Sequence, residues 1–103
     1  MKIVTANVNG IRAAGRKGFF DWVDETQADV VCIQETKAQI DQLTDELYHP
    51  KGYHCFYHDA QKKGYSGVAL YCKNKPDEVV IGMDNEEFDS EGRYIEAKFG
   101  KLS

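Results

Sequence analysis

The chain of 103 residues has the size of one domain, and 42% of its residues are hydrophobic, 12% aromatic and 29% charged. This composition excludes a collagen-like, a fully disordered or a disulfide-framework chain, and no apolar run is long enough to cross a membrane. The net charge of −4 is spread unevenly: residues 1–20 carry +4, 21–50 carry −7, 51–75 carry +4 and 76–103 carry −5. If the two basic segments converge in the fold, they form a positively charged patch that suits nucleic acid. Otherwise, their charge is ordinary variation over the protein surface.

The three cysteines stand far apart, at Cys32, Cys55 and Cys72. An odd number of widely spaced thiols favours reduced cysteines over a secreted disulfide scaffold. The first ten residues, MKIVTANVNG, are strand-like and lack the pattern of a signal peptide. We therefore expect a cytoplasmic protein with no membrane partner.

The first half of the chain predicts alternating strands and helices. Residues 2–8 predict a strand that ends at the turn Asn9-Gly10, and residues 29–34 predict a strand covered on both faces. Residues 16–27 predict a helix with an apolar face at Phe19, Trp22, Val23 and Thr26. Residues 37–48 predict a second helix, with an apolar stripe at Ile40, Leu43 and Leu47.

The second half of the chain predicts strands. They cover residues 53–58, 67–73, 78–82 and 93–99, and an acidic loop at 84–92 precedes the last of them. The order of helices and strands favours an α/β fold with a mixed sheet and helices packed on one of its faces.

Polar residues follow the two predicted strands of the first half. Asn7 and Asn9 end the first strand, and Glu35 follows the second. If these strands are parallel neighbours, Asn7 and Glu35 meet at one rim of the sheet, where open α/β sheets bind ligands. A carboxylate and an amide oxygen suit Mg²⁺, and Lys37 can offset charge there. The alternative is structural: Glu35 opens a helix and Asn7 forms a turn.

A glycine-rich segment, Gly64-Tyr65-Ser66-Gly67, follows Lys62-Lys63 and precedes a strand. Glycines let backbone N–H groups approach a phosphate, and an aromatic ring beside lysines suits a nucleotide backbone. The alternative is a hairpin turn next to two solvated lysines. In the same way, Arg12, Arg16 and Lys17 either contact phosphates or solvate the start of a helix.

A zinc site was considered for His54, Cys55 and His58. The segment alternates like a strand, so the two histidines do not share a helical face, and the sequence has neither a CxxC nor an HExxH motif. The sequence therefore argues against zinc.

Four segments carry a resemblance to a known family, in this order: MKIVTANVNGIRAA, ADVVCIQETKA, GYSGVALYCK and EGRYIEAKF. With these segments the chain resembles the exonuclease III-type abasic-site endonucleases of the endonuclease/exonuclease/phosphatase superfamily. NVNGIRAA together with QETKA separates this DNA-repair branch from relatives that act on inositol phosphates, sphingomyelin or poly(A).

The resemblance implies a four-layer α/β sandwich, with two mixed sheets packed between helices, of which this chain is the N-terminal portion. Enzymes of the family hydrolyse phosphodiester bonds of duplex DNA with Mg²⁺ or Mn²⁺. They incise 5′ to abasic sites and degrade one strand from a 3′ end. We therefore expect duplex DNA with abasic sites or 3′ ends as the partner.

The resemblance also implies roles for individual residues. Glu35 is a metal ligand, and Asn7 is a catalytic residue that can also reach the metal. The supporting residues of the site are Asn9, Lys37 and Arg93. The residues that face the DNA backbone are Arg12, Gly64 and Tyr65. Asn9 stands where some relatives carry Asp, which weakens any direct ligation by this amide.

One departure from the family is large. The family's catalytic Tyr, Gly-Asp-x-Asn and Ser-Asp-His segments do not occur in residues 1–103, which we therefore interpret as the N-terminal segment of a larger single domain. We expect this chain to be nearly inactive alone, and open sheet edges to favour oligomers. A non-catalytic nucleic-acid-binding or interaction module is the alternative. A phosphatase of small molecules is a third hypothesis, against which NVNGIRAA argues.

Overall fold

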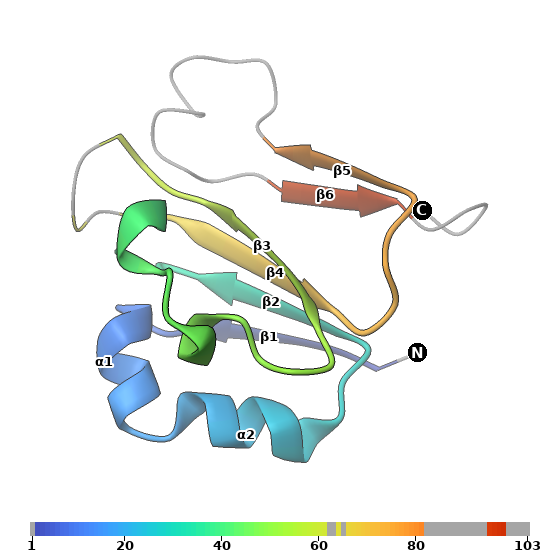
Figure 1. Cartoon of the computed structure of the whole chain (residues 1–103), viewed down its shortest axis with the longest axis horizontal. Coiled ribbons are helices and arrows are strands. Elements are labelled where there is room, and N and C mark those ends of the chain that lie inside the picture. The colour runs from blue at the N-terminus through green and yellow to red at the C-terminus, as the bar shows by residue number, and fades with distance from the viewer. Residues whose placement is uncertain (1, 62–63, 65, 82–94, 99–103) are drawn as a thin grey trace.

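The computed structural model describes residues 2–61, 64, 66–81 and 95–98, the last segment with only the side chain of Ile95 (Figure 1). The elements in chain order are β1 (Ile3–Asn7), α1 (Ile11–Arg16), α2 (Phe19–Thr26), β2 (Val30–Gln34), the 3₁₀ turns η1 (Ile40–Gln42) and η2 (Glu46–Tyr48), β3 (His54–His58), β4 (Val68–Cys72), β5 (Glu78–Ile81) and β6 (Ile95–Lys98). Every strand that the sequence predicts is present. The predicted acidic loop at 84–92 lies outside the described residues.

Four of the strands form one mixed sheet in the order β1-β2-β4-β3, while β5 and β6 form an antiparallel pair. β1 and β2 are parallel, and the helices α1 and α2 make the crossover that a parallel pair requires. β4 is antiparallel to both of its neighbours. The predicted mixed sheet is therefore confirmed.

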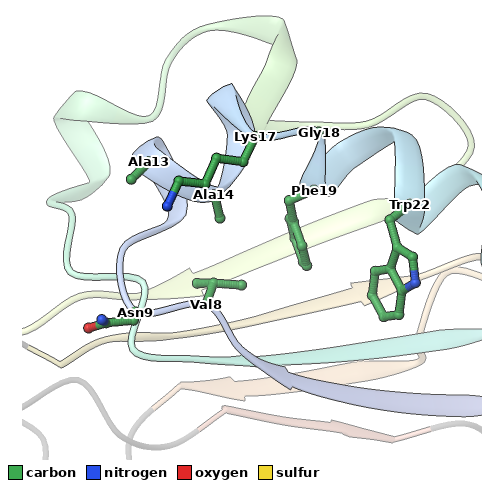
Figure 2. A pocket seen from close by; sticks show the side chains of 8 residues that line it. All are labelled: Val8, Asn9, Ala13, Ala14, Lys17, Gly18, Phe19 and Trp22. Atoms are coloured by element: carbon green, nitrogen blue, oxygen red, sulfur yellow. The ribbon is translucent and has the colours of Figure 1, made fainter.

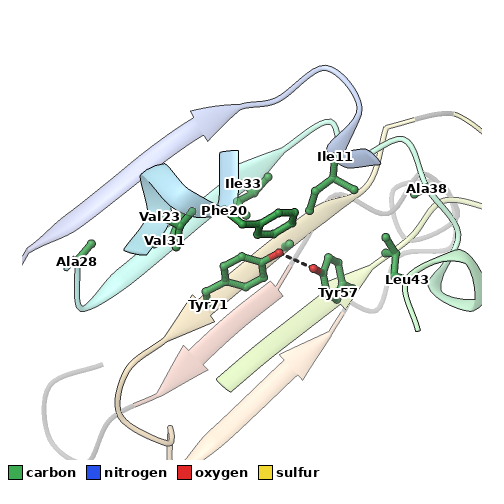
Figure 3. Packing of buried hydrophobic residues seen from close by; sticks show 11 residues of the cluster. Ile11, Phe20, Val23, Ala28, Val31, Ile33, Ala38, Leu43, Tyr57 and Tyr71 are labelled. Carbon is green, nitrogen blue, oxygen red and sulfur yellow. Dashed lines mark hydrogen bonds between the residues drawn. The ribbon is translucent and has the colours of Figure 1, made fainter. Parts of the chain in front are cut away.

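The two faces of the four-stranded sheet have different covers. On the first face, the side chains of the strands pack against the helices and the loops that follow them (Figure 3). This core consists of Ile11, Phe20, Val23, Ala28, Val31, Ile33, Ala38, Leu43, Tyr57, Ala69 and Tyr71. On the second face, Val30, Leu70 and Cys72 pack with Cys32, Phe56 and Ile95 of β6. The helices thus lie on one face, as the sequence predicts, and the strand pair β5–β6 covers part of the other.

The centre of the first face contains two buried tyrosines. Their hydroxyl groups are hydrogen-bonded to each other, and Tyr57 Oη donates to the carbonyl of Tyr48 at 2.5 Å, so Tyr71 supplies the proton between the two phenols (Figure 3). The rings meet edge to face, with centroids 5.9 Å apart. Both polar tips are satisfied inside the core, which removes the penalty of burying them.

The buried phenols and thiols make the fold sensitive to alkali. Burial raises the pKa of Cys55 to about 12 and of Cys72 to about 11, from 9.0, and raises the pKa of Tyr57 and Tyr71 as well. Between about pH 9 and 11 the unfolded chain therefore binds fewer protons than the folded one, so stability falls as pH rises. We expect the melting temperature to decrease over this range, and Cys55→Ala to reduce the slope. A level or rising melting temperature would contradict this.

The predicted helix at 16–27 is present as α2, but it begins at Phe19, and of the predicted face Val23 is buried while Trp22 is not. Helix α1 ends at Arg16 and α2 begins at Phe19, because Gly18 has a left-handed backbone (φ 94°) that separates the two helices. The buried face of α2 is Phe20 and Val23, whereas Trp22 is 41% exposed. The three-residue spacing from Phe20 to Val23 fits a helix as well as the predicted stripe does, so periodicity alone could not choose between them.

The predicted helix at 37–48 is wrong. Only the two short turns η1 and η2 form there, and of the apolar stripe Leu43 is buried while Ile40 and Leu47 are about half exposed. Side chains satisfy the backbone in place of a helical ladder: Asp59 accepts from the N–H of Ile40 at 2.8 Å, and Asp45 accepts from that of Leu47 at 3.0 Å. Local acceptors of this kind compete with helix formation.

None of the helices in the described part of the chain is long and apolar enough to cross a membrane.

Candidate active site

The parallel pairing of β1 and β2 brings two predicted site residues together. Asn7 pairs with Gln34, so Glu35, the next residue, comes to lie at the same rim. Asn7 Nδ2 donates a hydrogen bond to Glu35 Oε2. The sequence-based prediction that these two side chains meet beyond the ends of neighbouring strands is confirmed.

Two more predicted residues complete this group. The backbone N–H of Asn9 donates to Asn7 Oδ1 at 3.0 Å, and Lys37 Nζ donates to Asn9 Oδ1. Lys37 Nζ also lies 3.6 Å from Glu35 Oε1. The four residues, which we call the rim cluster, therefore form a closed ring of polar contacts. About two fifths of the Glu35 and Lys37 side chains is exposed, so the ring is open to solvent.

The backbone of the rim cluster is unusual. Asn9, Glu35 and Lys37 have φ angles of 47°, 55° and 52°, in the left-handed region that non-glycine residues rarely adopt. The alternative in which Glu35 opens a helix is therefore wrong, since no helix begins between Glu35 and Gln39 and the next turn, η1, starts at Ile40. The carbonyl of Glu35 accepts from the N–H of Gly10 at 2.8 Å, which ties it to the turn after β1.

The donor set of the rim cluster fits a hard divalent cation. Mg²⁺ takes one or two carboxylates and keeps several waters, and the half-exposed Glu35 offers one carboxylate with room around it. Asn7 turns its Nδ2 toward Glu35 and its Oδ1 toward the N–H of Asn9. In this orientation it holds the carboxylate in place, and its amide would have to turn over before its oxygen could reach the same cation.

The described residues do not support a second type of metal site. Among them, no three His, Cys, Asp or Glu side chains are close enough to hold a metal ion. His54 and His58 are the two ends of β3, so their Cα atoms are roughly 13 Å apart at the usual rise of a strand.

A basic hollow of about 400 Å³ opens next to Lys37. It is lined by Gly10, Arg12, Ala13, Arg16, Lys37 and Gly64. Arg12 and Arg16 are four residues apart on α1 and therefore share one face. Two segments that the sequence predicts to face DNA, at Arg12 and Gly64, thus converge here. Guanidinium groups bind phosphates in a planar, bidentate way, which makes this hollow a suitable phosphate site.

Two predicted site residues, Tyr65 and Arg93, lie outside the described residues. The sequence-based prediction missed Thr36, which is buried between Glu35 and Lys37. It included Gly67 in the glycine-rich segment proposed to approach a phosphate, but it did not predict the close approach of Gly67 to Thr36. No feature of residue type in QETKA or GYSGVALYCK marks that contact.

A second hollow, of about 450 Å³, is mostly apolar and lies between the turn after β1 and the helices α1 and α2 (Figure 2). It is lined by Val8, Asn9, Ala13, Ala14, Lys17, Gly18, Phe19 and Trp22. The rings of Phe19 and Trp22 lie side by side with centroids 5.8 Å apart (Figure 2). Since Trp22 is 41% exposed, this hollow presents apolar surface to solvent.

The chain is similar in sequence to known nucleases. The chain is 44% identical over 100 residues to an exodeoxyribonuclease of Bacillus subtilis (strain 168), covering 96% of this chain and 38% of the relative. It is 42% identical over 101 residues to the DNA repair nuclease APEX1 of Danio rerio, covering 96% of this chain and 33% of the relative. The chain thus spans little more than a third of the length of these proteins.

The fold has solved counterparts as well. The structure of an AP endonuclease from Archaeoglobus fulgidus matches 97% of this chain and 37% of its own, with a TM-score of 0.79 and 34% sequence identity. Residues 4–102 match the Endonuclease/Exonuclease/phosphatase family. Because this match covers almost the whole chain, the chain belongs to the endonuclease/exonuclease/phosphatase family.

Proposed function

We propose that the chain is the N-terminal segment of a DNA-repair nuclease that hydrolyses phosphodiester bonds of duplex DNA, at abasic sites and from 3′ ends, with Mg²⁺ or Mn²⁺. The observation that carries the proposal is the contact between Asn7 and Glu35 at the rim, beside a hollow lined by Arg12 and Arg16. Relatives named as an exodeoxyribonuclease and a DNA repair nuclease support it.

Different residues of the chain would have different roles in such a reaction. In hydrolysis a water molecule gives up a proton to a base as its oxygen bonds to phosphorus, one P–O ester bond breaks, and the leaving oxygen takes up a proton. When bound, Mg²⁺ would supply the positive charge that polarises the phosphoryl oxygens. Glu35 would hold the cation, Asn7 and Lys37 fix the direction of the Glu35 carboxylate, and Arg12 and Arg16 hold phosphates next to the site.

The proposal assigns binding and positioning to this chain, and the proton transfers to segments outside it. Within the described residues, the rim cluster contains one carboxylate and no imidazole. A unit that lacks its general base or acid loses most of its rate. Residues 1–103 are therefore expected to bind DNA while cleaving it little.

The test is Mg²⁺-dependent incision of a duplex with one abasic site by the purified chain, run beside DNA binding at several salt concentrations. We expect negligible incision, and binding whose salt dependence weakens in Arg16→Ala, because one phosphate contact is lost. Lys75→Ala, an exposed lysine on the β4–β5 connection, is the matched control and should leave binding unchanged. Rapid incision that Glu35→Ala abolishes would contradict the assignment of the proton transfers to other segments.

The binding arm of this experiment also decides the alternative function, a non-catalytic nucleic-acid-binding module. The basic hollow favours binding, and a module of this type needs no divalent cation. Tight DNA binding that neither Mg²⁺ nor Glu35→Gln changes would favour the module. Binding that strengthens with Mg²⁺ only when Glu35 is present would favour the nuclease.

We also propose that the edge of the sheet at β1 favours association of chains. A separate proposal concerns the compartment: the three cysteines are free, which suits a reducing environment. In the described part of the chain, β1 has a strand on one side only, and Ile3 on it is 58% exposed. Open edges beside apolar surface promote pairing between molecules. We expect the mean mass in light scattering to rise with concentration, and Ile3→Lys to suppress the rise. A monomer with a sharp melt at all concentrations would contradict this.

A further inference from the structure

Two segments of the chain cross closely beneath the rim cluster. The N–H of Thr36 donates to the carbonyl of Gly67 at 3.1 Å, and the N–H of Lys37 donates to that of Ser66 at 2.7 Å. On the other side, the carbonyl of Thr36 accepts from the N–H of Ile11 at 2.8 Å. Thr36 is only 1% exposed, so it is the buried centre of this crossing, which joins three parts of the chain.

The crossing leaves no room for a side chain at Gly67. A Cβ atom at this position would lie 2.3 Å from Thr36 Oγ1, far inside van der Waals contact. Gly67 also has a φ of 86°, which favours glycine independently. The two segments can therefore approach each other at this distance only with glycine here.

The crossing fixes the backbone positions from which the side chains of Glu35 and Lys37 extend. Thr36 stands between Glu35 and Lys37, and both of these residues have left-handed backbones that the hydrogen bonds to Ser66 and Gly67 help to hold. Any shift that pushes Thr36 away from Gly67 moves the Cα atoms of Glu35 and Lys37 with it. The contacts of Glu35 with Asn7 and Lys37 depend on those positions.

We infer that Thr36 and Gly67 are positioning residues for the carboxylate of Glu35. They act through the backbone: their close packing fixes the direction in which Glu35 meets Asn7 and any cation. The cation part of this inference rests on the proposed function, whereas the Asn7–Glu35 contact does not. The same hydrogen bonds link Thr36 and Lys37 to Gly67 and Ser66, and Gly64, which is near them in the sequence, lines the basic hollow.

The experiment compares two glycines with similar backbones. Gly67→Ala should shift the NMR signals of the Asn7 side-chain amide, which report its hydrogen bond to Glu35. It should also weaken Mn²⁺ binding by about tenfold or more, as is typical when a partner of a metal ligand is disturbed. Gly52→Ala is the control, because Gly52 has a φ of 92° and a Cβ there would meet nothing within 4 Å. It carries the same backbone strain and should leave both measurements unchanged.

A second substitution separates positioning from general damage. Thr36→Ala removes the Oγ1 atom that a Cβ at residue 67 would strike, so the double variant Gly67→Ala/Thr36→Ala should return both readouts toward those of the parent chain. If Gly67→Ala alone does not fold, Thr36→Ala and the double variant carry the test. Thr36→Ala then shifts the Asn7 signals, because it opens space at the crossing, and the double variant reverses part of that shift.

The outcomes distinguish this inference from the proposed function. If Mn²⁺ binds the parent chain and Glu35→Gln equally, the proposed cation site fails, and the Asn7 signals alone then decide the positioning role. Unchanged Asn7 signals in Gly67→Ala, or a double variant no closer to the parent chain than Gly67→Ala, overturn the inference.

Discussion

Glu35→Gln is expected to raise the dissociation constant for Mn²⁺ by more than about tenfold, the lower bound for disturbing even an outer partner of a metal ligand. Glutamine keeps the size and one oxygen of the side chain but loses the negative charge, which is what a hard cation binds. Lys37 Nζ, 3.6 Å from Glu35 Oε1, would then face no compensating carboxylate in the rim cluster. The measurement is the enhancement of water-proton relaxation during a Mn²⁺ titration, with folding of each variant checked by circular dichroism.

A matched control shows whether the effect belongs to this carboxylate. Glu25 lies exposed on α2, near the end of the sheet where Lys2 Nζ bonds the carbonyl of Thr26 at 2.7 Å. Glu25→Gln removes the same charge away from the rim and should leave the Mn²⁺ titration unchanged. Equal Mn²⁺ affinity in the parent chain and in Glu35→Gln would remove the cation site from the rim.

Tyr71→Ala is expected to destabilise the fold by about 3–5 kcal/mol, which is the usual cost of deleting a large aromatic side chain from a core. Tyr71 is completely buried, and its ring meets those of Tyr53 and Tyr57. A domain of this size has a total stability of roughly 5–15 kcal/mol, so much of it would be lost. The measurement is urea unfolding followed by the circular dichroism signal.

Tyr71→Phe is the control for the hydroxyl group. It keeps the ring and removes one hydrogen bond, while Tyr57 still donates to the carbonyl of Tyr48. We expect a loss of about 1 kcal/mol. If Tyr71→Ala costs no more than Tyr71→Phe, the packing of the ring contributes little, and the core would not depend on this residue.

The strands of this protein could be predicted because each has a local signature. Alternating or continuous apolar runs of β-branched residues found the six strands of the described residues, to within one or two residues at each end. The meeting of Asn7 and Glu35 followed from one further rule, that parallel neighbours end at the same side of a sheet. That prediction also required the two strands to be parallel neighbours, which the sequence left as a condition and the structure confirms.

The faces and bounds of the helices depend on contacts that a local pattern does not contain. Phe20, rather than Trp22, points into the sheet because of where Gly18 lets α2 begin. The segment after Lys37 winds into short turns because Asp59, from the loop after β3, satisfies the backbone at Ile40. Hydrophobic periodicity takes no account of the backbone conformation of Gly18, and Asp59 lies outside the periodic window of residues 37–48. Periodicity therefore gave a helix with partly the wrong face in the first case and a helix that does not form in the second.

The site was predictable only in its functional groups. Asn7, Asn9, Glu35 and Lys37 are polar and sit at strand ends, which marks them. Thr36 and Gly67 carry no such mark, because their role lies in a close approach between segments about thirty residues apart. A close approach between two segments so far apart in the sequence can be seen only in the folded structure.

The left-handed residues of the rim cluster have a consequence for how this protein could be redesigned. Asn9, Glu35 and Lys37 each hold a conformation that costs a non-glycine residue roughly 1–2 kcal/mol. A library selected only for thermal stability would therefore favour glycine at these positions, and in doing so would delete the carboxylate and the lysine. Heat resistance and the proposed phosphodiester chemistry thus compete for the same three positions, and a screen for one must hold the other fixed.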